Sequence, residues 1–142
     1  MTHLRGRVMS LDVGERRVGV AMSDLSQTLA SPYTTLQAHP QVVLFQKIQQ
    51  LIVQEEVVEL VIGLPISLNG QEGPQAQRIR QFIEALLAYV SIPIQTCDER
   101  YTTAEAQRMM IEAGLRPEQR KAKIDEVAAS IILQDYLNQQ RN

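Results

Sequence analysis

The sequence predicts a single α/β domain over residues 1–142, and three observations carry this prediction. Three short strand-like runs come first along the chain, and their short connections favour an antiparallel arrangement. Helical and strand-like segments then alternate, which is typical of layered α/β folds. The composition, with 44% hydrophobic and 21% charged residues, is that of an ordinary globular protein with a sizeable core.

The first two strands are expected at residues 7–13 and 17–23. Both runs are rich in apolar residues, and only Gly14, Glu15 and Arg16 separate them, which is a hairpin signal. A third strand is expected at residues 33–37, after a loop.

The period of the apolar residues changes to that of a helix after Pro40. Four apolar residues share one helical face: Leu44, Ile48, Leu51 and Ile52. A largely buried strand follows at residues 57–63, because its apolar run is nearly continuous and Pro65 ends it.

The second half of the chain adds one strand and three helices. Pro74 favours a helix start after a glycine-rich loop, and residues 92–97 form a short strand. Thr102 and Glu105 have the spacing of a capping box, which predicts the start of the next helix. The last helix covers about residues 124–137, so the order is β-β-β-α-β-α-β-α-α. No dinucleotide fingerprint or Walker loop follows any strand.

Charge and cysteine content bound the function classes. Fourteen basic and sixteen acidic residues give a net charge of −2, which by itself argues against a nucleic-acid partner. The single cysteine, Cys97, cannot form an internal disulfide and fits a reducing compartment. No apolar run is long enough to span a membrane. A cytoplasmic protein without membrane partners is therefore expected.

Asp12 is the first candidate functional residue, because a carboxylate within an apolar strand is costly unless something compensates it. The alternative is an aspartate that caps the turn at Gly14. Asp98 and Glu99 stand at the end of a later strand, where ligands of open α/β sheets gather. Adjacent strand residues point to opposite faces, so one of the two is expected to join Asp12. Either could instead pair with Arg100.

Asp125 is the third candidate, at the margin of the packed face of the last helix. Its alternative role is to stabilise the helix dipole. Three carboxylates from two strands and one helix repel one another and need cations. Oxygen ligands without histidine or cysteine favour Mg²⁺ or Mn²⁺, and two such ions can promote hydrolysis of a phosphodiester.

Short motifs follow one another along the chain in a specific order. They are Leu11-Asp12-Val13-Gly14, Arg17-Val18-Gly19-Val20-Ala21, Ser23-Asp24, Gly63-Leu64-Pro65, Asp98-Glu99-Arg100 with Thr102-Thr103, and Asp125-Glu126-Val127-Ala128-Ala129. In this order they resemble the YqgF family, a Holliday-junction-resolvase-like family that is also described as a pre-16S rRNA nuclease. The resemblance runs from about residue 5 to residue 138.

The resemblance implies an RNase H-like fold, with a mixed five-stranded sheet and helices on both faces. Its first three strands are antiparallel and its last two parallel to the first. It also implies a metal-dependent nuclease that processes pre-16S rRNA in ribosome biogenesis or resolves branched DNA, and the rRNA is favoured. Asp12, Glu99 and Asp125 match the family's acidic positions and would be catalytic, holding one or two Mg²⁺ or Mn²⁺ ions. Asp98 is the alternative to Glu99.

Basic residues near these motifs are candidates for phosphate contacts with structured nucleic acid. They are Arg16, Arg17, Arg100, Arg120, Lys121 and Lys123. Residues 116–123 hold four basic residues against Glu118 alone. The alternative is an ordinary solvated loop and helix edge.

Two other functions are compatible with the same residues. Asp12 and Gly14 before a hairpin also resemble the phosphate-binding start of actin-like sugar kinases, although those need two such domains. A non-catalytic factor that binds nucleic acid or ribosomes would keep the fold without cleavage. For a junction-cutting enzyme, a homodimer is the simplest source of symmetric cuts.

Overall fold

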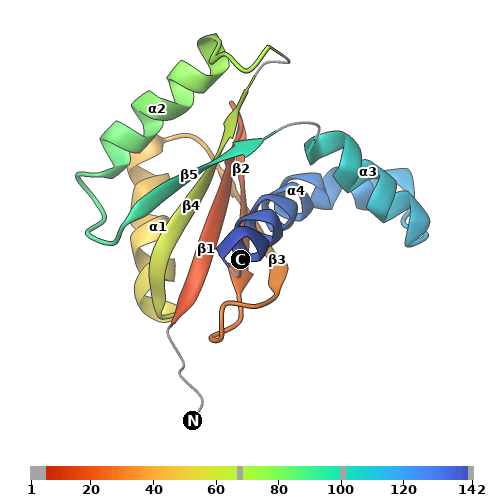
Figure 1. Cartoon of the computed structure of the whole chain (residues 1–142), viewed down its shortest axis with the longest axis horizontal. Helices are drawn as coiled ribbons and strands as arrows, with labels where there is room; N and C mark the ends of the chain where they lie inside the picture. Colours follow the sequence, from red (N-terminus) through yellow and green to blue (C-terminus); the bar gives the residue numbers. More distant parts are fainter. Residues whose placement is uncertain (1–5, 67–68, 100–101, 141–142) are drawn as a thin grey trace.

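A five-stranded sheet with strand order β3-β2-β1-β4-β5 forms the centre of the computed structural model, which describes residues 6–66, 69–99 and 102–140 (Figure 1). The strands are β1 (Arg7–Val13), β2 (Arg17–Ser23), β3 (Ala30–Gln37), β4 (Val57–Pro65) and β5 (Ile94–Glu99). The first three are antiparallel neighbours, whereas β4 runs parallel to β1 and β5 runs parallel to β4. The mixed sheet expected from the resemblance is confirmed.

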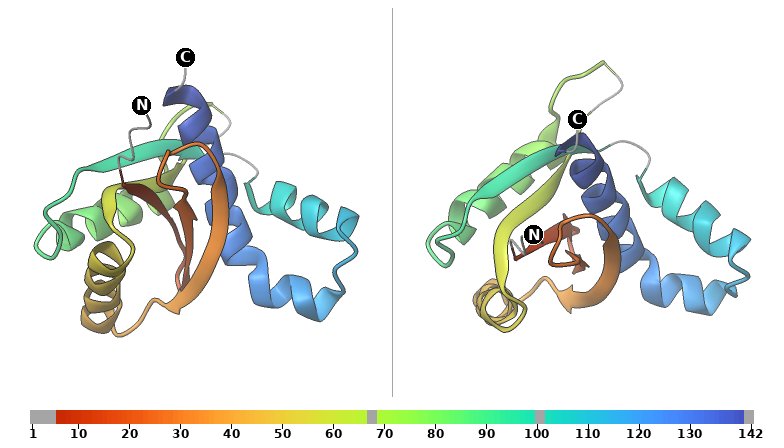
Figure 2. Two further views of the ribbon diagram at one scale, coloured as in Figure 1. Left: turned by 90° about the horizontal axis from the view of Figure 1, so that it is seen from below. Right: turned by 60° about the horizontal axis from the view of Figure 1, so that its bottom comes forward.

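Helices cover both faces of this sheet (Figures 1 and 2). Helices α1 (Gln41–Gln54) and α2 (Pro74–Leu86) pack on one face, against alternate strand residues such as Met9 and Leu11. The long helix α4 (Pro117–Gln140) packs on the other face, against Val8 and Val61. Successive side chains of β1 point to opposite faces of the sheet, so each one packs against the helices of one face only.

Helix α3 (Thr102–Glu112) and the first half of α4 project beyond the sheet and pack against each other (Figure 2). We call this helical pair the arm. A small apolar cluster of Ala106, Ala128 and Ile131 connects α3 to the middle of α4. None of the helices in the described ranges is long and apolar enough to cross a membrane.

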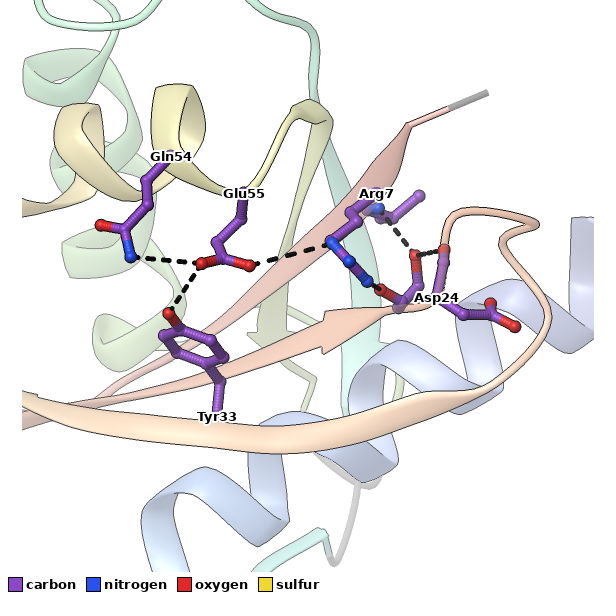
Figure 3. A network of polar contacts seen from close by, with 7 residues as sticks. Arg7, Asp24, Tyr33, Gln54 and Glu55 are labelled. Atoms are coloured by element: carbon purple, nitrogen blue, oxygen red, sulfur yellow. Dashed lines mark hydrogen bonds and ion pairs between the residues drawn. The ribbon is translucent and has the colours of Figure 1, made fainter. Parts of the chain in front are cut away.

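A polar network fastens α1 to the sheet near the start of β1 (Figure 3). Glu55, just after α1, accepts a hydrogen bond from the Tyr33 hydroxyl at 3.1 Å and lies 3.9 Å from the guanidinium of Arg7. Arg7 also donates to the carbonyl oxygen of Ser23 at 3.1 Å. These contacts tie the first residue of β1 to β2, β3 and α1.

Four predicted elements had wrong boundaries, and one of them, β4, continues two residues past its predicted end to Pro65. β3 begins at Ala30, because Ser31 and Pro32 are tolerated on an edge strand, and β5 spans Ile94–Glu99 because its pairing with β4 continues past its apolar run. Helix α4 begins seven residues earlier than predicted, at Pro117. Its first turns are polar on all sides, so the apolar period does not reveal them.

Candidate active site

Asp12 lies near the carboxyl end of β1, on the face that α4 covers. Two residues earlier on the same face, the Ser10 hydroxyl donates a hydrogen bond to the carbonyl oxygen of Ala129 in α4 at 2.7 Å. Burial is the main cause that raises the pKa of Asp12, and together with the negative charges of Glu99 and Asp125 it brings that pKa to about 7. The structure therefore brings together the three carboxylates that the sequence singled out.

Two glycines flank Asp12 and leave room for the other carboxylates. Gly19 is the partner of Asp12 on β2, and a Cβ there would overlap the carbonyl oxygen of Asp125. Gly63 follows Ile62, the partner of Leu11 on β4, and a Cβ there would lie 2.8 Å from Oε2 of Glu99. The backbone of α4 can come this close to β2 only because Gly19 carries no side chain, whereas Gly63 leaves room for the side chains of Ile132 and Glu99.

Sequence reasoning did not assign a role to either glycine. The available signal was a glycine inside an otherwise apolar strand, which often marks a close approach of another backbone. Gly19 and Gly63 both fit that description.

Glu99, rather than Asp98, is placed beside Asp12. Cys97 is buried in the core under α4, Asp98 is exposed, and Glu99 is half-buried, as the alternation of a strand requires. Burial raises the pKa of Glu99, and a hydrogen bond from the Thr102 side chain opposes that shift. The sequence predicted Thr102 only as a helix cap, so its hydrogen bond to Glu99 was not foreseen.

Asp125 lies in α4 and is held by Arg17 of β2. The Nε of Arg17 donates to Oδ2 of Asp125 at 2.7 Å, and both side chains are partly exposed. Arg17 was expected to contact phosphate. In the structure it pairs with the carboxylate of Asp125.

The donor set fits a hard divalent cation. All three side chains offer oxygen only, which suits Mg²⁺ or Mn²⁺. The mutual repulsion felt by Asp12 is also what a bound cation would relieve. Among residues 6–66, 69–99 and 102–140, no three acidic, histidine or cysteine side chains converge closely enough to enclose a metal as they stand.

The remaining basic candidates lie in different settings. Arg16 is exposed in the β1–β2 turn, and Lys121 and Lys123 are exposed on the arm. Arg120 donates to the side-chain oxygen of Gln107 at 3.2 Å and to the carbonyl oxygen of Leu115 at 2.9 Å, so its guanidinium joins the two helices of the arm. Arg100 lies outside the described residues.

Comparison with known proteins adds family information to this geometry. The model of the RuvX family, described as Holliday junction resolvase, matches residues 6–139. A protein of Roseiflexus sp. (strain RS-1), named "Putative pre-16S rRNA nuclease", is 55% identical over 136 residues, or 96% of each chain. A protein of the same name from Chloroflexus aggregans is 45% identical over 135 residues, or 95% of each chain.

Solved structures show the same fold at low sequence identity. RuvC of T. thermophilus, in complex with a Holliday junction substrate, superposes with a TM-score of 0.58 and 12% identity, over 96% of each chain. At this identity the likeness concerns the fold alone, and it agrees with the RNase H-like architecture expected from the motifs.

Proposed function

The chain belongs to the RuvX family of Holliday junction resolvases, and on that premise we propose that it is a metal-dependent nuclease whose site is built from Asp12, Glu99 and Asp125. The observation that carries the proposal is that two further carboxylates, Glu99 and Asp125, lie near enough to Asp12 for their negative charges to act on it. Gly19 allows this arrangement, because it lets the backbone of α4 at Asp125 come close to the sheet. We propose that residues 1–142 act as one nuclease domain.

Each residue of the site has a separate task in this proposal. Asp12, Glu99 and Asp125 hold one or two divalent cations, and Thr102 orients the carboxylate of Glu99 through its hydrogen bond. A bound Mg²⁺ or Mn²⁺ supplies a Lewis acid that activates water and neutralises charge on the phosphate. Arg17 holds the carboxylate of Asp125 in place at the edge of the site.

Pre-16S rRNA is the substrate that we favour, because the relatives at 55% and 45% identity carry that name. Branched DNA is the second candidate, since the family description specifies it. Exposed Arg16, Lys121 and Lys123 would contact the phosphates of either. The only cysteine of the sequence, Cys97, is buried and forms no disulfide, which supports a cytoplasmic location. Symmetric cleavage of a junction would require a homodimer.

Cleavage assays on both substrates test the proposal. Wild type, Asp12→Asn and Glu99→Gln are incubated with labelled pre-16S rRNA fragments and four-way DNA junctions, in Mg²⁺, Mn²⁺ or chelator. Both variants should cut at least about 100-fold more slowly, a larger loss than removal of an outer-sphere partner produces. The matched control is Asp98→Asn, which changes an exposed neighbour on the other face and should cut like wild type.

Two results would contradict the proposal. A folded Asp12→Asn protein that cuts as fast as wild type would rule out the carboxylate site. A wild-type protein that binds these substrates and cuts neither in any metal would favour a non-catalytic binding factor.

A further inference from the structure

A pocket of about 530 Å³ opens on the face of the sheet opposite to the carboxylates. It lies between the β1–β2 turn, the β3–α1 connection and α2. Val13 and the buried side chains of Ile79 and Phe82 line its apolar part. Exposed Gln41, Arg78 and Gln81 add amide and guanidinium groups. Its volume is within the range of roughly 300–1,000 Å³ that is usual for small-molecule sites.

The pocket and the candidate active site share the end of one strand. Asp12 points toward α4, whereas the next residue, Val13, packs toward α1 and α2 and lines the pocket. The turn between them is tight, because the amide of Gly14 donates to the carbonyl oxygen of Arg17 at 2.9 Å. The turn therefore forms a narrow ridge, with Arg17 reaching the carboxylate site and Glu15 reaching the pocket.

The chemistry of the pocket matches a flat heterocycle with a polar edge. Its apolar side chains suit the faces of a nucleobase, and the glutamine amides can both donate and accept hydrogen bonds at its edge. Glu15 is the one carboxylate among the lining residues, and it is 3.7 Å from Arg78 in an exposed pair. Exposed pairs of this kind contribute little stability, so a ligand can replace Glu15 as the partner of Arg78 at a small cost in free energy.

We propose that this pocket accepts one unpaired nucleobase of the strand whose phosphate lies at Asp12. The strand would cross the ridge of the β1–β2 turn, beside the exposed Arg16, and place the neighbouring base in the pocket. The inference rests on the proposed nuclease function and adds a substrate requirement: the nucleotide next to the cut is single-stranded or extruded from a helix.

The double variant Arg78→Ala/Gln81→Ala tests the pocket. Both side chains are exposed on α2, and alanine favours a helix, so the fold should be retained. The matched control is Gln77→Ala/Arg80→Ala, which also removes one glutamine side chain and one positive charge from exposed positions of α2 that do not line the pocket. The probes are fluorescently labelled single-stranded RNA, single-stranded DNA and a blunt duplex of one sequence, measured by anisotropy in chelator so that nothing is cut.

The pocket variant should bind the single strands about tenfold more weakly than the control variant does, and the duplex equally well. A 2-aminopurine placed beside the cut should change its fluorescence on binding wild type and respond less with the pocket variant. The RNA and DNA arms report which sugar the site prefers. Equal affinity of the two variants for the single strands, or an equal loss for single strands and duplex, would overturn the inference.

Cleavage assays separate this inference from the nuclease proposal. Wild-type cleavage in Mg²⁺ together with an unchanged strand preference in the pocket variant would refute the pocket alone. A selective loss of single-strand binding with no cleavage by wild type would refute the nuclease and support the base pocket.

Discussion

At the scale of single residues, Asp12 is costly to the folded protein because its negative charge is poorly compensated. Its carboxylate is buried near two further negative charges, and its pKa rises from the ordinary value of 3.8 to about 7. A folded protein that binds this proton more tightly than the unfolded chain does loses stability as the pH rises between these two values. Above that range Asp12 is charged and repelled by its neighbours.

Replacement of Asp12 by asparagine should therefore stabilise the protein at pH 8 in chelator. We expect a gain of about 1–3 kcal/mol in the free energy of unfolding, because an uncompensated buried charge is removed. The gain should be smaller at pH 4, where the wild-type carboxyl group is largely protonated. Urea denaturation of both proteins at the two pH values measures it. Equal stabilities of wild type and variant at pH 8 would contradict the account.

At the scale of whole elements, the sequence predicted those parts of the fold that a local pattern encodes. The hairpin at Gly14 and the helix start at Pro74 lie where expected, because turn and proline chemistry act within a few residues. β5 was misplaced because its position depends on pairing with β4, and the first turns of α4 were missed because their contact with α3, through Arg120 and Gln107, is polar. The same limit applies to the candidate site. Local motifs predicted its carboxylates, whereas the role of Gly19 depends on a helix about 100 residues away.

Substitution of the two flanking glycines by alanine should separate the packing of α4 from the geometry of the site. Gly19→Ala should cost about 3 kcal/mol or more in folding stability, because its Cβ meets the backbone of Asp125, which can move only with the helix. Gly63→Ala meets the ends of the Ile132 and Glu99 side chains, which can rotate, so it should cost about 1 kcal/mol. Gly63→Ala should still lower the cleavage rate strongly, because its Cβ displaces the side chain of Glu99.

Thermal denaturation and cleavage rates of these variants are the measurements. Gly73→Ala serves as the control, since a Cβ there has no heavy atom within 4 Å. Its stability and cleavage should stay close to those of wild type. A Gly19→Ala protein as stable as the Gly73→Ala protein would show that α4 does not need this close approach.

At the scale of the whole molecule, the net charge of −2 hides an uneven distribution. Residues 41–77 hold four glutamates against Lys47 alone. If Asp12, Glu99 and Asp125 hold cations, their charges are neutralised and no longer add to the negative surface that a nucleic acid would meet. Exposed Lys121 and Lys123 lie on the arm, on the same helix as Asp125. Two exposed basic residues therefore lie on the helix that carries Asp125, whereas the acidic segment 41–77 runs through α1 and β4.

Reversal of these two lysines tests whether the arm contacts phosphates. Lys121→Glu/Lys123→Glu should bind single-stranded nucleic acid more weakly, and each lost contact should reduce the slope of log K against log salt by about 0.7. Titrations at several salt concentrations in chelator measure both effects. The control is Lys47→Glu, which changes an exposed lysine of α1 and should leave the slope unchanged. A double variant with the wild-type slope would show that phosphates are bound elsewhere. Any interaction between exposed charges of the arm and phosphates is screened by salt, so its loss must change the slope.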